Sequence, residues 1–486
     1  MSGARAVLKN SAALVLSKVL GLSNTILIAW LIARTLQATG LGAYTTVMAF
    51  FMTLSLWTDL GISQLLPREV SRDLSRTNQY VVHLGAFSVV ISTAITALLI
   101  LFAPVLGGSP DTTAGLRIIS LALVPTALSG ILHATMVTHQ RVDLIAYSQI
   151  AESVGGIAGT AFLLANGYGV VAVLTNFTAF RYLTLFVRGH LLSRNVSALR
   201  WEFDLRFLKV ILESLKTFAL IGVLNGVTSQ AEILALSMFG DDAAVGHYSA
   251  ALKFITVWYL VPESLMAVLF PLMARAFDES HARFQDIQRR AVKYLLAIAL
   301  PLSAGLFAIG EPILVWFYGP GFDESILVLR LLSVLPILIF VDGILWRILL
   351  ARNEQDLALK ADVSCGVIRL ITAVVLVYLY GYIGAGLALL AAYGYYVAVH
   401  YYCVQACGTR LSITSDTWRL CSAAVLMGLS SWIMTRLLGV PVLVNIPISI
   451  TLYLALSLLF GGFDAQDFGI LQGVMGWRRA PSSGGG

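Results

Sequence analysis

Charged side chains are scarce in this sequence. They account for 12% of its 486 residues, whereas hydrophobic residues account for 58%. Soluble domains carry about 25% charged residues, so this chain has too few polar side chains to cover a folded surface in water. The composition excludes the soluble globular classes and indicates a protein that crosses a membrane many times.

Cysteine is equally rare, with four residues in the chain. Cys403 and Cys407 have the i, i+4 spacing of one helix face, but no nearby histidine completes a set of metal ligands. Cys365 and Cys421 also lie in or beside apolar segments. We therefore expect the cysteines to fill apolar space, and we expect no metal site and no cofactor.

Long polar loops are missing as well. In the longest, residues 191–210, aromatic side chains such as Trp201 and Phe203 alternate with charged ones, a pattern that predicts a short interfacial helix. No loop offers room for a catalytic domain. We therefore assign no catalytic residue and do not expect an enzyme.

What the sequence has instead is a succession of apolar segments. Each is long enough to cross a bilayer as a helix, which takes about 20 residues. We predict an all-α polytopic membrane protein with about 14 transmembrane helices. The expected spans are 11–33, 41–64, 80–103, 116–138, 144–166, 168–190, 211–239, 243–274, 291–309, 326–350, 357–379, 382–403, 418–438 and 441–460.

The loops between these spans alternate in charge. The segment before the first span, the even-numbered loops and the tail carry most of the basic residues, for example Arg68 and Arg72 in the second loop. The odd-numbered loops are nearly bare of them, and the seventh carries Asp241. Because basic loops stay in the cytoplasm, the pattern predicts that both termini are cytoplasmic.

The chain also repeats its own residues over a long range. One set recurs 204 positions later, so that Gly42, Tyr44, Phe50, Asp59 and Pro67 correspond to Gly246, Tyr248, Phe254, Glu263 and Pro271. A second set recurs 213 positions later, so that Arg117, Ser120, Gly130 and Asp143 correspond to Arg330, Ser333, Gly343 and Asp356. The preserved order indicates a duplicated six-helix unit, an arrangement in which transporters place the substrate between two bundles.

The predicted domains follow from this repeat. Residues 1–190 form the first six-helix lobe and residues 211–403 the second, related to the first by the repeat. Residues 191–210 link the two lobes in the cytoplasm. Residues 404–460 add two transmembrane helices, and residues 461–486 form a cytoplasmic tail.

Motifs in both halves resemble one known family. In the first half these are residues 42–44 (Gly-Ala-Tyr), 58–61 (Thr-Asp-Leu-Gly) and 67–70 (Pro-Arg-Glu-Val). In the second half they are residues 245–254 and 268–271 (Val-Leu-Phe-Pro). They are similar to the signatures of bacterial polysaccharide-exporter membrane proteins, the Wzx-type flippases for lipid-linked oligosaccharides, in the superfamily of multidrug exporters and lipid II flippases.

This resemblance covers residues 1 to about 460. It implies two six-helix lobes around a central cleft, plus two extra helices. The implied substrate is a polyprenyl-pyrophosphate-linked oligosaccharide, moved by alternating access across the bacterial cytoplasmic membrane for surface polysaccharide assembly. The implied partners are this lipid, membrane lipids and other polysaccharide assembly proteins, but no nucleic acid.

A pyrophosphate that crosses an apolar layer needs cationic partners, and charges inside spans indicate function because they are costly there. Lys18 is the strongest candidate. It lies in the first span on a polar stripe with Ser11 and Thr25, which should face a cavity. The alternative is a structural ion pair with Asp59 on the next span.

Three further cations are candidate substrate-binding residues. Arg369 lies two turns after Asp362, and Lys253 lies in the outer half of its span, so each could bind pyrophosphate or pair with an acid. Arg181 lies at the same depth as Glu152 on the neighbouring span, which favours an internal salt bridge.

Two acids are candidates for coupling transport to a proton or a sodium ion. Glu232 lies close to a helix face that carries Asn225 and Thr228. Asp342 lies toward the cytoplasmic end of its span, where pairing with a basic residue is the alternative.

Other functions remain open at this point. A cation-coupled multidrug exporter of the same fold would need an acidic, aromatic pocket, whereas the charges inside these spans are at least as basic as acidic. A membrane enzyme of glycan assembly would need a catalytic loop. A scramblase without ion coupling is compatible with the sequence.

Overall fold

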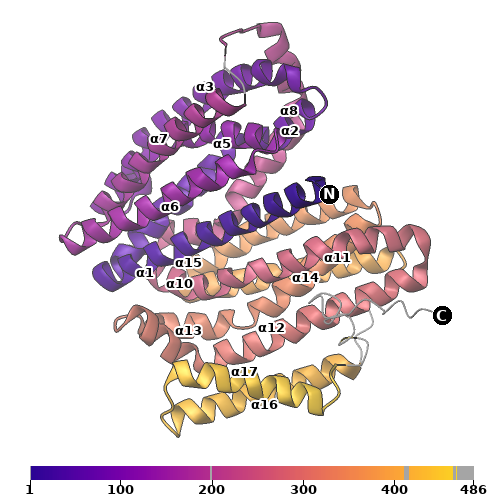
Figure 1. Cartoon of the computed structure of the whole chain (residues 1–486). Helices are drawn as coiled ribbons and strands as arrows, with labels where there is room; N and C mark the ends of the chain where they lie inside the picture. The colour runs from indigo at the N-terminus through magenta and orange to yellow at the C-terminus, as the bar shows by residue number, and fades with distance from the viewer. Residues whose placement is uncertain (1, 197–199, 410–414, 464–466, 468–486) are drawn as a thin grey trace. The chain divides into compact units, whose positions relative to one another are not determined.

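The computed structural model describes residues 2–196, 200–409, 415–463 and 467 (Figure 1), with side chains from residue 21 onward except 22, 217 and 221. These residues form helices and connecting turns, and the described part contains no strand. The helices are α1 Ser2–Asp59, α2 Ile62–Val70, η1 Leu74–Arg76, α3 Thr77–Leu106, α4 Pro110–Ser120, α5 Leu123–Thr138, α6 Val142–Ala165, α7 Val170–Asn195, α8 Leu205–Ser229, α9 Ala231–Phe239, α10 Asp242–Thr256, η2 Val257–Tyr259, α11 Leu260–Glu279, α12 His281–Tyr318, α13 Asp323–Leu332, α14 Leu335–Ala351, α15 Gln355–Ala406, α16 Ser415–Arg436 and α17 Val442–Leu459.

Among the described residues, eight helical segments are long and apolar enough to cross a membrane, and ten if each of two bent helix pairs is one span. Two of these segments each contain two expected spans. The backbone leaves the helical region at Gln37 in α1 and at Gly381 in α15, so each of these helices holds two of the expected spans. The remaining two expected spans coincide with α6 and α16. The predicted all-α membrane fold is confirmed.

The duplication is visible in the backbone itself. Gln140 and Asn353 both have positive φ, at 57° and 62°, and stand 213 positions apart. Gly167 and Gly381, another pair of repeated positions, have φ of 79° and 57°. Left-handed conformations are uncommon for residues other than glycine, so their recurrence at matched turns supports an inherited local structure.

Side-chain contacts repeat as well. Ser120 donates a hydrogen bond to the carbonyl of Arg117 at 2.6 Å, and Ser333 donates one to the carbonyl of Arg330 at 2.7 Å. Each serine lies where a helix pair breaks, between α4 and α5 in the first half and between α13 and α14 in the second. The repeated Arg-x-x-Ser sequence therefore ends the corresponding helix in each half, α4 in the first and α13 in the second.

The second half of α1 crosses α10 at two glycines. A Cβ added to Gly42 would lie 1.6 Å from the carbonyl oxygen of Asp242, and one added to Gly246 would lie 1.9 Å from that of Ala38. Gly246 and Asp242 stand 204 positions after Gly42 and Ala38. The contact is therefore reciprocal, as in a self-complementary two-fold interface, and it requires glycine on both sides.

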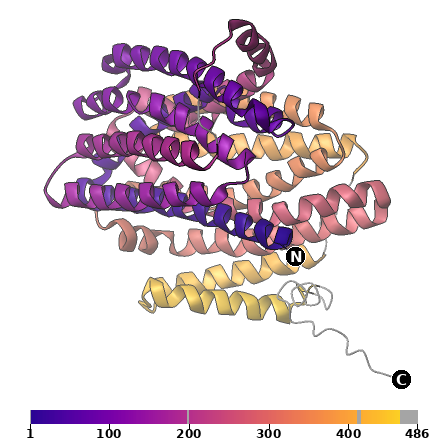
Figure 2. The ribbon, with the colours of Figure 1, turned by 45° about the horizontal axis from the view of Figure 1, so that its top comes forward.

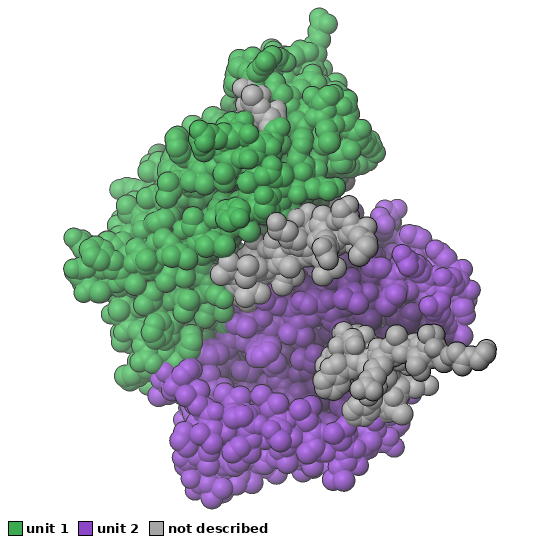
Figure 3. Space-filling view, in the orientation of Figure 1, with its two compact units in different colours: residues 1–253, 317–328, 363–392 green, residues 254–316, 329–362, 393–486 purple. Residues whose placement is uncertain are grey.

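Two compact units make up the chain (Figure 3): residues 1–253, 317–328 and 363–392 form one, and residues 254–316, 329–362 and 393–486 the other. This grouping differs from the predicted lobes, because α15 contributes its middle to the first unit and both ends to the second. The predicted lobe boundaries remain a prediction.

In the second unit, α16 and α17 lie side by side (Figures 1 and 2). Asn445 of α17 joins them, since its amide donates to the carbonyl of Ser431 at 2.8 Å and its oxygen accepts from the Ser431 hydroxyl at 2.9 Å. Tyr453 of α17 donates to the carbonyl of Ala297 in α12 at 2.8 Å. The two additional helices therefore pack on α12.

The linker differs from its prediction. Among the described residues of 191–210 there is no separate interfacial helix, because α7 continues to Asn195 and α8 begins at Leu205. Asp204 accepts a hydrogen bond from the backbone N–H of Arg206 at 2.9 Å and so caps α8. The aromatic residues of this linker instead form one side of an apolar groove on the first unit.

Candidate functional site

The seventh expected span, 211–239, is broken at Gln230, in its second half. α8 ends at Ser229 and α9 begins at Ala231, and the two helices are bent by 53°. Two hydrogen bonds fix the end of α8 on α1: Trp57 donates to the carbonyl of Val223 at 3.2 Å, and Thr53 to that of Gly226 at 3.1 Å. Discontinuous helices at membrane depth are where transporters build ion and substrate sites.

Glu232 lies in the first turn of α9, immediately after this break. It binds Arg369 of α15 in a two-pronged ion pair, with Nε to Oε1 and Nη2 to Oε2 both at 2.8 Å. The Glu232 side chain is 4% exposed and that of Arg369 is 14% exposed. Arg369, predicted to bind substrate, and Glu232, predicted to couple transport to an ion, therefore lie in one site. Each neutralises the charge of the other.

Close packing supports this pair from one turn away. A Cβ added to Gly366 of α15 would meet the Thr228 methyl group at 3.1 Å. α15 therefore approaches the end of α8 closely, next to the helix break. The alternative that Arg369 pairs with an acid is confirmed, and that acid is Glu232. Asp362, two turns before Arg369 in the sequence, accepts from Trp346 Nε1 at 2.9 Å.

Arg181 has the structural partner that its depth suggested. Its Nη1 lies 3.0 Å from Glu152 Oε1, between α7 and α6. Its guanidinium also lies over the rings of Phe177 and Phe51, at 4.6 Å and 5.8 Å from their centroids. Cation–π contacts of this kind hold an arginine in place, so the ion pair with Glu152 is confirmed and a substrate role stays a prediction.

The remaining predicted residues have separate locations. Lys253 lies partly buried at the end of α10. Lys18 lies in α1, but its side chain lies outside the described residues. Asp342 of α14 lies in the second unit, where its Oδ1 is 2.7 Å from Nδ1 of His400. Asp59 accepts from the Ser63 hydroxyl at 2.8 Å.

Arg188 and His400 are among the buried basic residues that the sequence analysis did not single out. Arg188 of α7 is 6% exposed and donates to the hydroxyls of Ser148 at 3.1 Å and Ser129 at 2.9 Å. His400, near the end of α15, is fully buried. Both lie within a few residues of an expected span end, where depth alone does not distinguish a buried side chain from one that reaches the interface.

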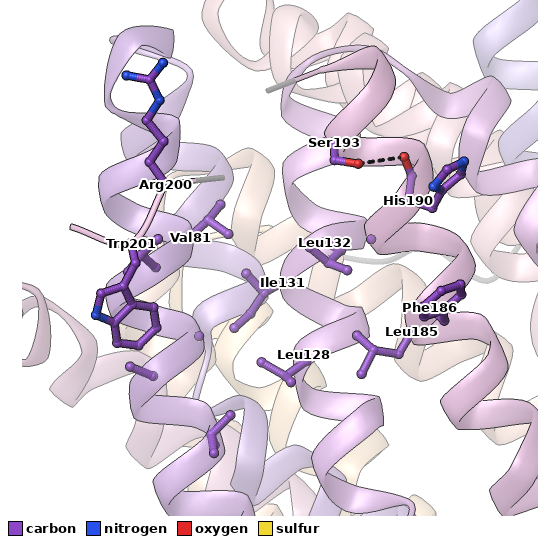
Figure 4. Close-up of a pocket in the computed structure, with 15 residues that line it drawn as sticks. Val81, Leu128, Ile131, Leu132, Leu185, Phe186, His190, Ser193, Arg200 and Trp201 are labelled. Carbon is purple, nitrogen blue, oxygen red and sulfur yellow. Dashed lines mark hydrogen bonds between the residues drawn. The ribbon is translucent and has the colours of Figure 1, made fainter. Parts of the chain in front are cut away.

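An apolar groove of about 860 Å³ opens on the first unit between α3, α5 and α7 (Figure 4). Gly85 and Gly189 leave room for it, since a Cβ at either would meet its nearest neighbour only at 3.8 Å or 3.9 Å. Its apolar lining includes Val81, Leu128, Ile131, Leu132, Leu185 and Phe186. Its polar residues are His190, Ser193 and Arg200.

The linker builds one wall of this groove. Asn78 holds Arg200 through two hydrogen bonds, from its amide to the Arg200 carbonyl at 2.9 Å and from the Arg200 N–H to its oxygen at 2.8 Å. Phe203 stacks on His83 with ring centroids 4.9 Å apart, and Trp201 stacks on Phe203 at 6.2 Å. Trp201 is 77% exposed, as tryptophan is at a membrane interface.

No group of three histidine, cysteine or acidic side chains with the geometry of a metal site occurs among the described residues.

A match to the family described as "Polysaccharide biosynthesis protein" covers residues 31–327, which is more than half of the chain. The chain belongs to this family. The resemblance noted in the two repeated motifs is thereby confirmed.

Two curated relatives have names that refer to glycan transport or flipping. The succinoglycan biosynthesis transport protein ExoT of Rhizobium meliloti is 26% identical over 234 residues, which cover 47% of this chain and 45% of that protein. The probable low-salt glycan biosynthesis flippase Agl15 of Haloferax volcanii is 22% identical over 235 residues, 47% of this chain and 50% of that protein. The chain spans about half the length of the curated relatives it matches.

Solved structures share the fold over most of the chain. A lipid II flippase MurJ in an inward closed conformation has a TM-score of 0.76 at 19% identity, covering 93% of this chain and 99% of its own. An inward-facing MATE-family multidrug resistance transporter has a TM-score of 0.66 at 14% identity, covering 80% and 95%. At these identities the likeness establishes the fold, which is that of the MOP superfamily transporters.

Proposed function

We propose that this protein moves a polyprenyl-pyrophosphate-linked oligosaccharide across the cytoplasmic membrane by alternating access, with both termini in the cytoplasm. Its family, and relatives that are named for glycan transport and flipping, support a transporter rather than an enzyme. The multidrug exporter shares the fold, but the family match favours the glycan substrate.

The observation that carries the mechanism is the Glu232–Arg369 pair. A guanidinium binds a carboxylate and a phosphate with the same two-pronged geometry. Glu232 therefore occupies the position on Arg369 that a pyrophosphate oxygen would take. Its location at a broken helix, with both side chains nearly buried, suits a site that opens only in part of the transport cycle.

Glu232 and the pyrophosphate would compete for Arg369, and this competition provides a way to couple transport to an ion. When pyrophosphate replaces Glu232 on Arg369, the displaced carboxylate is left in an apolar environment, which is costly. A proton or a sodium ion bound to Glu232 would offset that cost. We propose that this exchange links substrate binding to the cation, while Lys18 and Lys253 contribute further phosphate contacts.

The experiment is flipping of the lipid-linked oligosaccharide in proteoliposomes. Arg369→Ala should lower the initial rate by roughly two orders of magnitude, because a charge-assisted contact of about 3 kcal/mol is lost. Arg369→Lys should keep part of the rate, since it keeps the charge but loses the fork. Arg141→Ala serves as the control, because Arg141 pairs with Asp143 in a partly exposed position. Normal flipping by Arg369→Ala would sink the mechanism.

The groove between α3, α5 and α7 is proposed to hold the isoprenoid chain of this substrate. Its lining is apolar, and Arg200 stands at its rim as a partner for the first phosphate. Gly189→Leu should fill the groove and slow flipping severalfold. Gly130→Leu is the matched control, because a Cβ at Gly130 meets nothing within 4 Å and Gly130 does not line the groove. Equal rates for both variants would place the lipid chain elsewhere.

A further inference from the structure

His400 stands between two carboxylates in the second unit. Its Nδ1 lies 2.7 Å from Asp342 Oδ1, and its Nε2 lies 3.5 Å from Asp362 Oδ1. The histidine side chain is 1% exposed, whereas Asp362 is 39% exposed. Asp342 comes from α14, Asp362 from the beginning of α15, and His400 from its end after the break at Gly381.

The protonation state of the ring follows from this geometry. A neutral imidazole has one N–H and one lone pair, so one of its nitrogens would direct a lone pair toward a carboxylate. An imidazolium carries an N–H on both nitrogens. Nδ1 is hydrogen-bonded to Asp342, whereas Nε2 reaches Asp362 at ion-pair distance without a hydrogen bond. Two acids around a buried neutral ring would repel each other in an environment with few dipoles, so this arrangement favours the protonated ring.

The other charged groups nearby belong to the same cluster. On α14, Arg347 donates to the carbonyl of Gly343 at 3.0 Å and interacts electrostatically with Asp342 and with Glu263 of α11. On α15, the ring of Tyr396 lies 6.1 Å from that of His400. Trp346 of α14 donates to the second oxygen of Asp362 at 2.9 Å, which fixes this carboxylate with Oδ1 toward the histidine.

We infer that His400, Asp342 and Asp362 form a proton-binding clasp that joins α14 to both ends of α15. A proton from water enters at Asp362, the most exposed of the three side chains, and binds His400 Nε2. The protonated ring then holds both carboxylates. Loss of the proton to water leaves two acids without a shared cation, so the three helical segments separate or admit water.

The role of this clasp in coupling rests on the proposed flippase function. α15 carries Arg369 and two of the three clasp residues, Asp362 and His400. A proton at His400 therefore sets the position of the helix that presents the phosphate-binding arginine. The coupling ion is then a proton, and sodium is not required.

Two measurements on the full-length purified protein test this inference, and the first needs no substrate. The thermal unfolding midpoint is measured from about pH 6 to about pH 10, across the range in which a paired histidine titrates. Because the clasp stabilises the protein only while His400 is protonated, the wild-type midpoint should fall as pH rises. His400→Arg, a permanent cation, should flatten this fall. His190→Gln, which alters an exposed histidine of α7, should retain it.

Asp342→Asn and Asp362→Asn should each reduce the pH dependence, since each removes one carboxylate that favours the charged ring. These variants keep the inference testable if His400→Arg fails to fold. An unfolding profile that is unchanged in both asparagine variants would overturn the clasp.

The second measurement is flipping in proteoliposomes at constant sodium, with and without a pH gradient of one unit. One coupled proton corresponds to a driving force of about tenfold. The wild type should respond to the gradient and Asp362→Asn should not. A wild type that flips lipid but ignores the gradient, or that responds to sodium alone, would overturn the proton assignment and leave the flippase function intact. A wild type that flips no lipid, with an intact pH-dependent unfolding profile, would instead reject the function and keep the clasp.

Discussion

Thr45 donates a hydrogen bond to Ser249 at 3.3 Å, and these two residues stand 204 positions apart. That separation is the offset at which Gly42 recurs as Gly246. A residue that contacts its own counterpart must lie close to the axis relating the two copies. The hydrogen bond and the reciprocal glycine contacts are therefore what a two-fold relation between the two copies, with its axis at the crossing of α1 and α10, would produce.

The first prediction concerns this crossing. Gly42→Ala and Gly246→Ala should each lower the free energy of unfolding by at least about 1–3 kcal/mol, because the added Cβ would overlap a backbone carbonyl that no side-chain rotation can move. Gly130→Ala should be close to neutral, since nothing lies within 4 Å of its Cβ. The measurement is thermal or denaturant unfolding in detergent. Equal stability of all three variants would contradict the close crossing.

The second prediction concerns the charge pair. Glu232→Gln removes the carboxylate that Arg369 binds, and breaking a buried ion pair costs about 3–5 kcal/mol. The double variant Glu232→Gln, Arg369→Gln should recover much of that loss, because no buried charge remains at this position. Unfolding of the purified variants gives both values.

The control for this pair lies on the surface. Glu279→Gln disrupts an exposed pair with Arg283 and should cost less than about 1 kcal/mol. If Glu232→Gln were as mild as Glu279→Gln, the ion pair between α9 and α15 would not form in the membrane.

The sequence predicted the spans well because composition and helix period act locally. The breaks at Gln37 and Gly381 fall between expected spans, and the breaks near Ser120 and Ser333 fall at repeated positions. The repeat was readable because duplicated halves keep the residues that turns and close crossings require. Gly167 and Gly381 are such residues, with positive φ at equivalent turns.

The ion-pair partners of the charged residues were harder to predict from the sequence. Arg181 and Glu152 could be matched because their helices follow each other in the chain. Arg369 was compared with Asp362, its neighbour two turns away, whereas its partner Glu232 is 137 positions distant. Depth and sequence proximity do not determine which faces of distant helices meet. His400 gave no signal because a single histidine within an apolar segment is compatible with many surroundings.

The third prediction concerns orientation. Single cysteines at positions 200 and 241, in a protein from which the four native cysteines are removed, both occupy exposed sites. Because basic loops remain in the cytoplasm, a membrane-impermeant thiol reagent added to intact cells should label position 241 but label position 200 only after permeabilisation. Labelling of position 200 from outside would invert the proposed orientation, and with it the side from which protons reach His400.

The last prediction concerns Asn445, which joins α16 and α17. It is fully buried, and its side-chain oxygen accepts hydrogen bonds from Ser431 at 2.9 Å and from Ser449 at 2.7 Å. Asn445→Leu removes the shared partner of both hydroxyls. Ser449 lies on α17 itself, so the bonds with Ser431 that are lost between the two helices are the Ser431 hydroxyl to the Asn445 oxygen and the Asn445 amide to the Ser431 carbonyl. Each interhelical hydrogen bond within a membrane contributes about 0.6–2 kcal/mol, so this variant should destabilise the pair by about 1–4 kcal/mol.

The loss should be confined to these two helices. Hydrogen–deuterium exchange of the purified protein should therefore increase in α16 and α17 while α1 and α10 stay protected. Thr451→Val is the matched control, because Thr451 lies on an exposed face of α17 and bonds only its own helix, at the carbonyl of Pro447. Unchanged exchange in Asn445→Leu would show that apolar packing against α12, through contacts such as Leu420 and Ala297, holds the pair without the asparagine.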